Sequence, residues 1–261
     1  MKNQSGLQPK HGSNRPQFLQ TIRYIKTTRW SLKDFIEFAL TTTIRVWLRL
    51  VMGKEKRDKE QWVRRFYDSW ANYEPEVSRA LRQIRGNVFI DVGASRGQYT
   101  FPLSKRFGHV YSLEPLAENI KFLRHEVLRL RRPNVSLLQL AASNEYGRVR
   151  LNLNPNNIYG GASLLGASER HEFVDAQTLS GLFGGMDIDL VKVDVEGGEW
   201  LVLKGAESIM PQIKRWMIEL HDPAREKELD SYLRRYGYRT CWLKNARSLP
   251  HIFATRDKIT A

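Results

Sequence analysis

An acid and two glycines stand in a spaced pattern directly after a strand-like run. The segment VFIDVGASRG puts Asp91 in the run and glycines at positions 93 and 97. A dinucleotide fingerprint laid on Gly93 would need a glycine at position 91 or 96, where Asp91 and Arg96 stand. The Gly-Lys-Ser/Thr of a P-loop does not occur in the chain. An acid opening the loop would repel a pyrophosphate, but it suits a ligand that carries an ammonium group.

A second acid has the spacing of a ribose-binding group. Glu114 ends the next strand-like run, 17 residues after Gly97, where its carboxylate could accept hydrogen bonds from both ribose hydroxyls. Glycines without side chains, an acid for the ammonium group and a carboxylate for the diol together predict S-adenosylmethionine as the ligand. The alternative is structural: Asp91 would cap a helix, and Glu114 would be an exposed strand end.

Carboxylates and a histidine follow two later strand-like runs. Asp194 and Glu196 follow the first, and Glu219 and His221 follow the second. Methyl transfer from a sulfonium is an in-line displacement, in which the enzyme mainly aligns the acceptor. A hydroxyl acceptor also benefits from a base that takes its proton. We expect His221 or Asp194 to be this base, with Glu196 or Glu219 orienting it.

The alternative for the acids is again structural. Glu196 and Glu199 could simply begin a helix, where acids are favoured by the helix dipole, and we expect this for Glu199. The cluster would also allow a divalent ion, but no tight ligand spacing demands one, so we expect no metal site.

Apolar runs alternate with amphipathic stretches from about residue 86 onward. Near-continuous apolar strands separated by helices predict a doubly wound, mostly parallel sheet. Its ligand site would lie beyond the carboxyl ends of the strands, and the strands before Asp194 and His221 should be neighbours. The expected strands are 88–92, 110–114, 135–140, 189–195 and 215–220, and the expected helices are 97–107, 116–130, 198–209 and 224–236.

The remaining segments predict further β structure. Residues 238–243 and 248–255 indicate a late antiparallel hairpin at an edge of the sheet, and residues 148–176 interrupt the alternation with extra strands. The polar, glycine-rich stretch 154–168 predicts either a flexible rim over the acceptor pocket or an inert surface loop. We assign no role to the histidines that lie away from the strand-end motifs, which are His109, His125, His171 and His251.

Composition excludes several classes of protein. Of the 261 residues, 41% are apolar and 27% are charged, as in a globular chain with a real core, which excludes collagen-like and wholly disordered chains. The single cysteine, Cys241, excludes an internal disulfide and favours a reducing compartment. The first 30 residues are polar and basic, and they contain no apolar segment of the kind found in a secretory signal peptide. We therefore expect a cytoplasmic protein, with peripheral membrane contact as an option.

The net charge of +14 is concentrated at the start of the chain. Residues 1–86 hold 18 Lys and Arg against 8 Asp and Glu, whereas the rest of the chain holds 24 against 20. We expect a disordered tail over 1–18, a basic helical extension over 19–85 and the catalytic domain over 86–261. The leader, as we call residues 1–85, could engage nucleic acid, an anionic membrane or an acidic partner, or it could be a solvated face.

Two parts of the leader predict helices. The apolar stretch 35–52 is interrupted by charges, with seven uncharged residues at most in a row, so it is too short to span a membrane. It could lie in a membrane interface or pack on the domain. Aromatic and aliphatic residues recur at helical spacing over 62–84, with a break at Pro75, and predict a helical cap on the domain.

Several of these motifs resemble the FkbM family of S-adenosylmethionine-dependent methyltransferases. They are FIDVGASRGQYT, SLEPLAENIKFL, LAASNEYG, DIDLVKVDVEGGEWLVLKGA and WMIELHD. The resemblance runs from about residue 88 to 221, and the block from Lys192 to Glu199 is its most specific part. It implies a class I methyltransferase fold, similar to the Rossmann fold, and methyl transfer mostly to hydroxyl oxygens. Departures from the family pattern are Ser95 in place of Asn and Ser180 in place of Asp.

The resemblance also assigns residues to the cofactor. Asp91, Gly93 and Gly97 would frame its methionine end, Glu114 would hold its ribose, and the segment 139–142 would lie by the adenine. The full set expected at the cofactor is Asp91, Gly93, Ala94, Gly97, Tyr99, Thr100, Glu114, Gln139, Ala141 and Ala142.

The sequence thus predicts an O-methyltransferase that acts on a hydroxyl of a sugar, a glycan or a small metabolite. An RNA methyltransferase is the first alternative, motivated by the basic leader, although no recognisable RNA module or Asn-Pro-Pro-Tyr motif is present. A catalytically inactive adaptor that binds nucleic acid or membrane is the second. The retained acids at positions 91, 114 and 194 argue against it.

Overall fold

The computed structural model describes residues 74–153, 162–164, 168–244 and 249–256. The expected disordered tail and most of the expected helical extension therefore lie outside the described residues. So does most of the proposed rim at 154–168. Within the described residues, no helix has the length and apolarity needed to cross a membrane.

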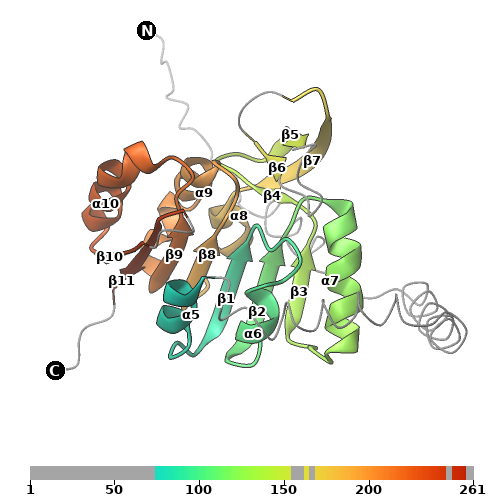
Figure 1. The fold of residues 1–261 in the computed structure, drawn as a ribbon, viewed down its shortest axis with the longest axis horizontal. Helices are drawn as coiled ribbons and strands as arrows, with labels where there is room; N and C mark the ends of the chain where they lie inside the picture. Colours follow the sequence, from blue (N-terminus) through green and yellow to red (C-terminus); the bar gives the residue numbers. More distant parts are fainter. Residues whose placement is uncertain (1–73, 154–161, 165–167, 245–248, 257–261) are drawn as a thin grey trace, which may run out of the picture.

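The described chain is built on a seven-stranded sheet with the order β10-β11-β9-β8-β1-β2-β3 (Figure 1). β11 pairs antiparallel with both of its neighbours, whereas the pairs among β9, β8, β1, β2 and β3 are all parallel. The strands are β1 (Gly86–Val92), β2 (Phe107–Leu113), β3 (Val135–Leu138), β8 (Leu190–Val193), β9 (Arg215–Glu219), β10 (Arg239–Leu243) and β11 (His251–Thr255).

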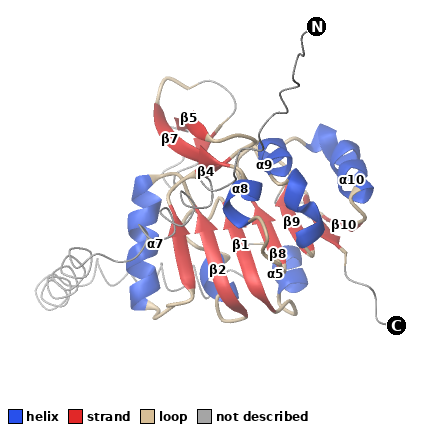
Figure 2. Cartoon of the chain, turned by 180° about the vertical axis from the view of Figure 1, so that it is seen from behind, coloured by secondary structure: helices blue, strands red, loops and turns tan. Residues whose placement is uncertain are grey.

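Helices cover both faces of this sheet. Figure 1 shows α5 and α6 in front of the strands, and Figure 2 shows α8 on the opposite face. The elements are α5 (Pro75–Leu81), α6 (Thr100–Leu103), α7 (Ala117–Arg129), α8 (Leu179–Phe183), α9 (Glu199–Gly205) and α10 (Glu226–Arg235), with short 3-10 helices η1 (Glu207–Gln212) and η2 (Pro223–Arg225).

Side chains along β1 point alternately to the two faces of the sheet, so an apolar core forms on each face. Phe89 packs in one apolar cluster with residues of α5, α6 and α7, and Ile90 packs in a second cluster with residues of α8, α9 and α10. Both side chains are fully buried. Because successive strand residues point to opposite faces, a strand buried on both sides has to be apolar throughout, as the sequence indicates.

A second, four-stranded sheet has the order β4-β7-β5-β6 and interrupts the alternation of strands and helices. Its strands are β4 (Ala141–Ala142), β5 (Gly147–Leu153), β6 (Ala162–Ser163) and β7 (His171–Gln177). β4 follows β3 directly, so the small sheet stands beyond the carboxyl end of β3 (Figure 1). This confirms the extra β structure expected over 148–176.

The predicted fold class is confirmed, with differences in detail. The helix expected over 97–107 is only Thr100–Leu103, because glycine-dependent turns occupy the residues before it. The late hairpin forms at the edge of the sheet, but its inner strand is the antiparallel one. Pro75 opens α5, and the buried Val77 and Leu81 fix this helix on the domain as a cap.

Candidate active site

The turn after β1 can be built only with glycine at two positions. Gly93 and Gly97 have φ angles of +79° and +81°, which side chains with a Cβ rarely adopt. A Cβ on Gly93 would lie 1.8 Å from the backbone oxygen of Asp194, and one on Gly97 would lie 2.3 Å from the Phe101 ring. The backbone N–H groups of Gly93 and Ala94 both donate to the carbonyl oxygen of Leu113. The turn is therefore held between β2 and the end of β8.

Asp91 is buried beneath this turn. Its Oδ2 accepts a hydrogen bond from the Thr100 hydroxyl at 2.6 Å, and that hydroxyl lies 2.8 Å from the Ser112 hydroxyl. Its Oδ1 is buried and has no hydrogen-bond partner among the described residues. Burial raises the pKa of Asp91, and the nearby Lys192 opposes this shift. Asp91 therefore keeps one oxygen available as an acceptor.

Glu114 is not the exposed strand end of the structural alternative. It is only 4% exposed and accepts three hydrogen bonds. The donors are the backbone N–H of Ser95 at 2.8 Å, the backbone N–H of Leu116 at 3.0 Å and the side-chain amide of Asn119 at 3.1 Å. Burial raises the pKa of Glu114, and these three donors oppose the shift. The carboxylate is thus fixed in position, and Oε2 accepts only one of the three bonds.

The residues expected by the adenine follow β3. Gln139 is exposed directly after the strand. Ala141 and Ala142 are buried and form β4, where they pair with Ala176 and Gln177 of β7. The small sheet therefore fixes the backbone of this segment beside the carboxyl end of β3.

A row of charged side chains lies on the sheet face below α5. Strand register explains it: Asp91 of β1 pairs with Lys192 of β8, and Glu219 of β9 pairs with His251 of β11. Residues directly paired across strands share a face of the sheet. The two pairs, together with Asp194, which lies two residues after Lys192, therefore present their side chains to one region at the carboxyl ends of the strands.

Lys192 is the cation of this row. It is fully buried, its ammonium lies 2.8 Å from Asp194 Oδ2, and it stands 4.3 Å from the centre of the Tyr99 ring. Burial lowers the pKa of Lys192, but the surrounding carboxylates raise it by more than burial lowers it. The net shift is upward, so the ammonium stays charged. Tyr99, which we expected at the cofactor, has its hydroxyl hydrogen-bonded to the buried Glu74. Tyr99 thus contacts both Lys192 and Glu74.

Asp194 directly follows β8, and Glu219 ends β9. These two strands are neighbours, as predicted for the strands before Asp194 and His221. Burial would raise the pKa of Asp194, but the charge and hydrogen bond of Lys192 lower it to about 2. Burial and the charge of Asp194 raise the pKa of Glu219 to about 9. Two adjacent carboxyl groups cannot both ionise easily, so this pair holds one proton at neutral pH, on Glu219.

His221 is held between two acids. Its Nδ1 lies 2.9 Å from Glu199 Oε1, and its Nε2 lies 3.5 Å from Glu196 Oε2. Burial lowers the pKa of His221, but hydrogen bonds with Glu196 and Glu199 outweigh it and raise the pKa to about 10. Glu199 begins α9 as expected, and it also holds this imidazolium. At neutral pH the imidazole has no free lone pair with which to accept a proton.

Three charged residues in or beside this row were missed by the sequence analysis. Glu74 precedes α5, Lys192 stands within β8, and His251 begins β11. The expectation that His251 lies away from the strand-end motifs is wrong, because its Nε2 is 3.9 Å from Glu219 Oε2. The late hairpin predicted from the sequence could have indicated this position of His251. A strand that runs antiparallel to β9 begins beside the carboxyl end of β9.

The fold is that of a class I methyltransferase. The chain belongs to the FkbM methyltransferase family, because the family model, described as a methyltransferase FkbM domain, matches residues 91–240. This range includes the turn after β1, the acid after β2 and the charged row on β8 and β9. Comparison with curated proteins gave no match.

The chain is similar to solved methyltransferase structures. An FkbM methyltransferase from Methylobacillus flagellatus KT has a TM-score of 0.50 and 17% identity, over 66% of this chain and 45% of that one. TrmK of M. capricolum, in complex with S-adenosyl-homocysteine, has a TM-score of 0.46 and 10% identity, over 69% of this chain and 67% of that one. The present chain thus spans less than half of that FkbM protein.

Proposed function

We propose that this chain is an O-methyltransferase that uses S-adenosylmethionine, with a hydroxyl of a sugar, a glycan or a small metabolite as the acceptor. The observation that carries the proposal is the contact between the glycine turn and the charged row. Gly93 lies against the backbone of Asp194 so closely that a methyl group would not fit between them. A cofactor seated on the turn would therefore have an ionised carboxylate beside it.

The residues around the turn fit the cofactor, which is S-adenosylmethionine. Gly93 and Gly97 allow the positive φ angles and the tight internal packing that give the turn its shape beside the methionine end of the cofactor. The unpartnered Oδ1 of Asp91 is an acceptor for an ammonium group, and the fixed carboxylate of Glu114 stands at the end of β2 for the ribose. When bound, the cofactor supplies an activated methyl group on a sulfonium.

Asp194 is the base in this proposal. Its carboxylate is ionised at neutral pH and 29% exposed, so an acceptor hydroxyl can reach it. As the hydroxyl oxygen forms its bond to the methyl carbon and the carbon–sulfur bond breaks, the hydroxyl proton passes to Asp194. Lys192 and the protonated Glu219 orient the carboxylate through the transfer. A low pKa makes Asp194 a weak base, so alignment of the acceptor supplies most of the rate enhancement.

Our order of preference between the two expected bases changes accordingly. His221 is protonated between Glu196 and Glu199, so it suits a positioning role better than proton abstraction. Its positive charge beside the acidic row stabilises the ionised form of Asp194. Glu196, at φ +53°, stands in a backbone conformation that is uncommon for residues other than glycine, as is frequent at functional sites.

The experiment is methyl transfer with labelled S-adenosylmethionine and extracts of the host, followed by identification of the labelled product. Label in an ether-linked methyl group on a sugar or small metabolite would support the proposal. Label in RNA would favour the alternative suggested by the basic leader. Cofactor binding without transfer to any fraction would favour the inactive adaptor.

A further inference from the structure

His251 presents an unused lone pair in a buried position. Its side chain is 1% exposed, and its Nδ1 lies 3.1 Å from the backbone carbonyl oxygen of Leu249, which can only accept a hydrogen bond. The ring proton therefore stands on Nδ1 and the lone pair on Nε2. Among the described residues, Nε2 is buried without a hydrogen-bond partner. A histidine that ligates a metal commonly donates its other ring N–H to a backbone carbonyl in this way.

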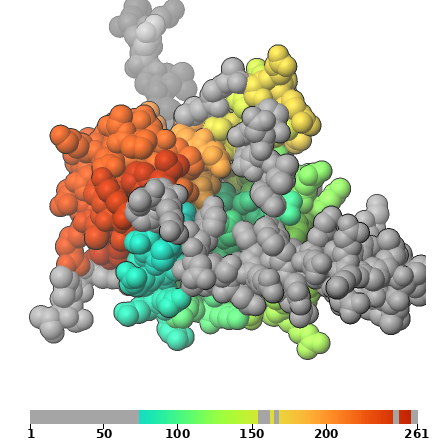
Figure 3. All heavy atoms as spheres, in the orientation of Figure 1, coloured from blue at the N-terminus to red at the C-terminus, as the bar shows by residue number. Residues whose placement is uncertain are grey.

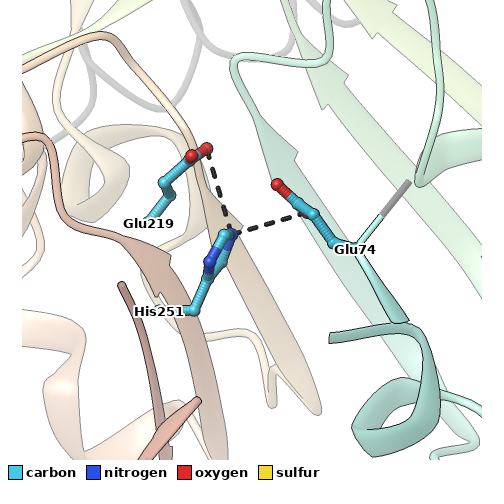
Figure 4. Close-up of side chains that lie close together, drawn as sticks. All are labelled: Glu74, Glu219 and His251. Carbon is cyan, nitrogen blue, oxygen red and sulfur yellow. Dashed lines mark ion pairs between the residues drawn. The ribbon is translucent and has the colours of Figure 1, made fainter. Parts of the chain in front are cut away.

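Two carboxylates face the same nitrogen. His251 Nε2 lies 3.5 Å from Glu74 Oε2 and 3.9 Å from Glu219 Oε2, as Figure 4 shows. Neither contact is a hydrogen bond, because Nε2 has no hydrogen-bond partner among the described residues. The two distances suit ligands of one ion, because donor atoms about 2.0–2.2 Å from a metal lie at most about 4.4 Å apart. All three ligand atoms lie within 4.8 Å of one another, so a small shift of one carboxylate would bring every pair within this limit.

The charges around the cluster also favour a cation. Four carboxyl groups, those of Glu74, Asp91, Asp194 and Glu219, act on the single ammonium of Lys192. Buried carboxylates in excess over cations are costly unless they are protonated or bound to a metal. A divalent ion between Glu74, Glu219 and His251 would take the place of the proton that Glu219 otherwise holds, and it would offset the charge of the remaining carboxylates beside the unpartnered nitrogen.

The other metal-like grouping, which consists of Asp194, Glu219 and His221, is less suited to an ion. Both nitrogens of His221 already face Glu199 and Glu196, and Asp194 is paired with Lys192. An ion there would have to displace these partners. The nitrogen of His251 is unpaired among the described residues. Glu74 Oε2 accepts a hydrogen bond from the Tyr99 hydroxyl, but a carboxylate oxygen has a second lone pair that an ion can use.

We propose that Glu74, Glu219 and His251 bind one divalent first-row metal ion, such as Mn²⁺ or Zn²⁺. A mixed nitrogen and oxygen donor set favours these ions over Mg²⁺ and Ca²⁺, which prefer oxygen ligands. The site goes beyond methyl transfer and departs from our expectation that the chain holds no metal. It ties the cap helix α5, through Glu74, to the sheet edge, through Glu219 and His251.

The test is metal binding by the full chain, stripped with a chelator and then titrated with Mn²⁺ while free Mn²⁺ is measured by electron paramagnetic resonance. We expect one ion per wild-type chain, and loss of this binding in His251→Gln and in Glu74→Gln. His171→Gln, which changes an exposed histidine on β7, should bind as the wild type does. So should His221→Gln, which distinguishes the two groupings. Binding of S-adenosyl-homocysteine by each variant verifies that it is folded.

Three results would overturn the proposal. The first is a wild-type chain that binds no Mn²⁺ in stoichiometric amount, with the same result for Zn²⁺ by calorimetry. The second is a folded His251→Gln variant that binds as tightly as the wild type. The third is loss of the ion in His221→Gln together with its retention in Glu74→Gln, which would place the ion at Asp194, Glu219 and His221.

Discussion

At the scale of single residues, the site depends on how each acid is held. Glu114 and Asp91 both end up buried, but they are held differently. Three N–H donors fix the Glu114 carboxylate, whereas Asp91 keeps one oxygen without a hydrogen-bond partner among the described residues. The fixed carboxylate of Glu114 can therefore accept hydrogen bonds from a diol, and the unpartnered oxygen of Asp91 can accept one from an ammonium group.

Glu114→Ala should weaken cofactor binding by about 1–3 kcal/mol, since charge-assisted hydrogen bonds to the ribose are lost. That loss corresponds to a rise in Kd of about 5- to 150-fold. Calorimetry with S-adenosyl-homocysteine measures it. Glu118→Ala, in the first turn of α7, is a control on the same segment and should bind normally. Equal affinity of wild type and Glu114→Ala would remove Glu114 from the cofactor site.

His221 should make stability depend on pH above neutrality. Its folded-state pKa of about 10 lies above its ordinary value of 6.5, so folding favours the protonated form. This contribution to stability is fully present below pH 6.5 and is lost as the pH rises toward 10. Denaturant unfolding of the wild type between pH 6.5 and 10 should show a decline that His221→Gln reduces. Parallel pH profiles for the two proteins would contradict the imidazolium between Glu196 and Glu199.

At the scale of elements, the turn after β1 joins the cofactor site to the end of β8. Gly93→Ala should perturb both, because its Cβ would meet the backbone oxygen of Asp194 at 1.8 Å in addition to the strain of a φ of +79°. Gly185→Ala is the matched control, since its φ is +83° and nothing lies within 4 Å of the added Cβ.

Gly185→Ala should therefore lower the free energy of unfolding only by the penalty for a left-handed backbone, about 1–2 kcal/mol. It should leave cofactor affinity unchanged. Gly93→Ala should cost more than the control and also weaken cofactor binding. Urea unfolding and calorimetry measure the two effects. Equal losses of stability in the two variants would mean that the turn does not contact β8 as described.

The sequence predicted the parallel strands, the glycine turn and the acids at the strand ends, because each depends on local patterns. It could not predict the partners of those acids. Residue 251 is separated from Glu219 by a helix and a strand, and only the antiparallel insertion of β11 brings them together. Lys192 was visible within the family motif, but its place between Asp91 and Asp194 depends on strand register.

We prefer Asp194 to His221 as the base for a related physical reason. A histidine near acids was expected to become a better base, but two acids at hydrogen-bond range stabilise its protonated form so strongly that it no longer accepts a proton at neutral pH. Sequence distance between Glu199 and His221 gave no sign of their contact, which forms because α9 begins beside the end of β9.

At the scale of the whole molecule, the basic leader carries a prediction of its own. Residues 1–86 hold 18 Lys and Arg against 8 Asp and Glu, so the full chain should bind anionic liposomes at low salt. Binding should fall as salt approaches the physiological range, because screening increases. Deleting residues 1–55 should abolish it, and zwitterionic liposomes serve as the control. No binding at low salt would leave the leader as a solvated basic segment.

The central claim concerns the carboxylate that takes the acceptor proton. Asp194→Asn keeps the shape of the side chain and removes its charge, so turnover on the acceptor should fall by about 10²- to 10⁴-fold. Affinity for S-adenosyl-homocysteine should barely change. Asp187→Asn, at an exposed position before β8, is the matched control and should keep full turnover. The most direct measurement is transfer of labelled methyl groups to the acceptor by these three proteins. Near-normal turnover by Asp194→Asn would contradict the account.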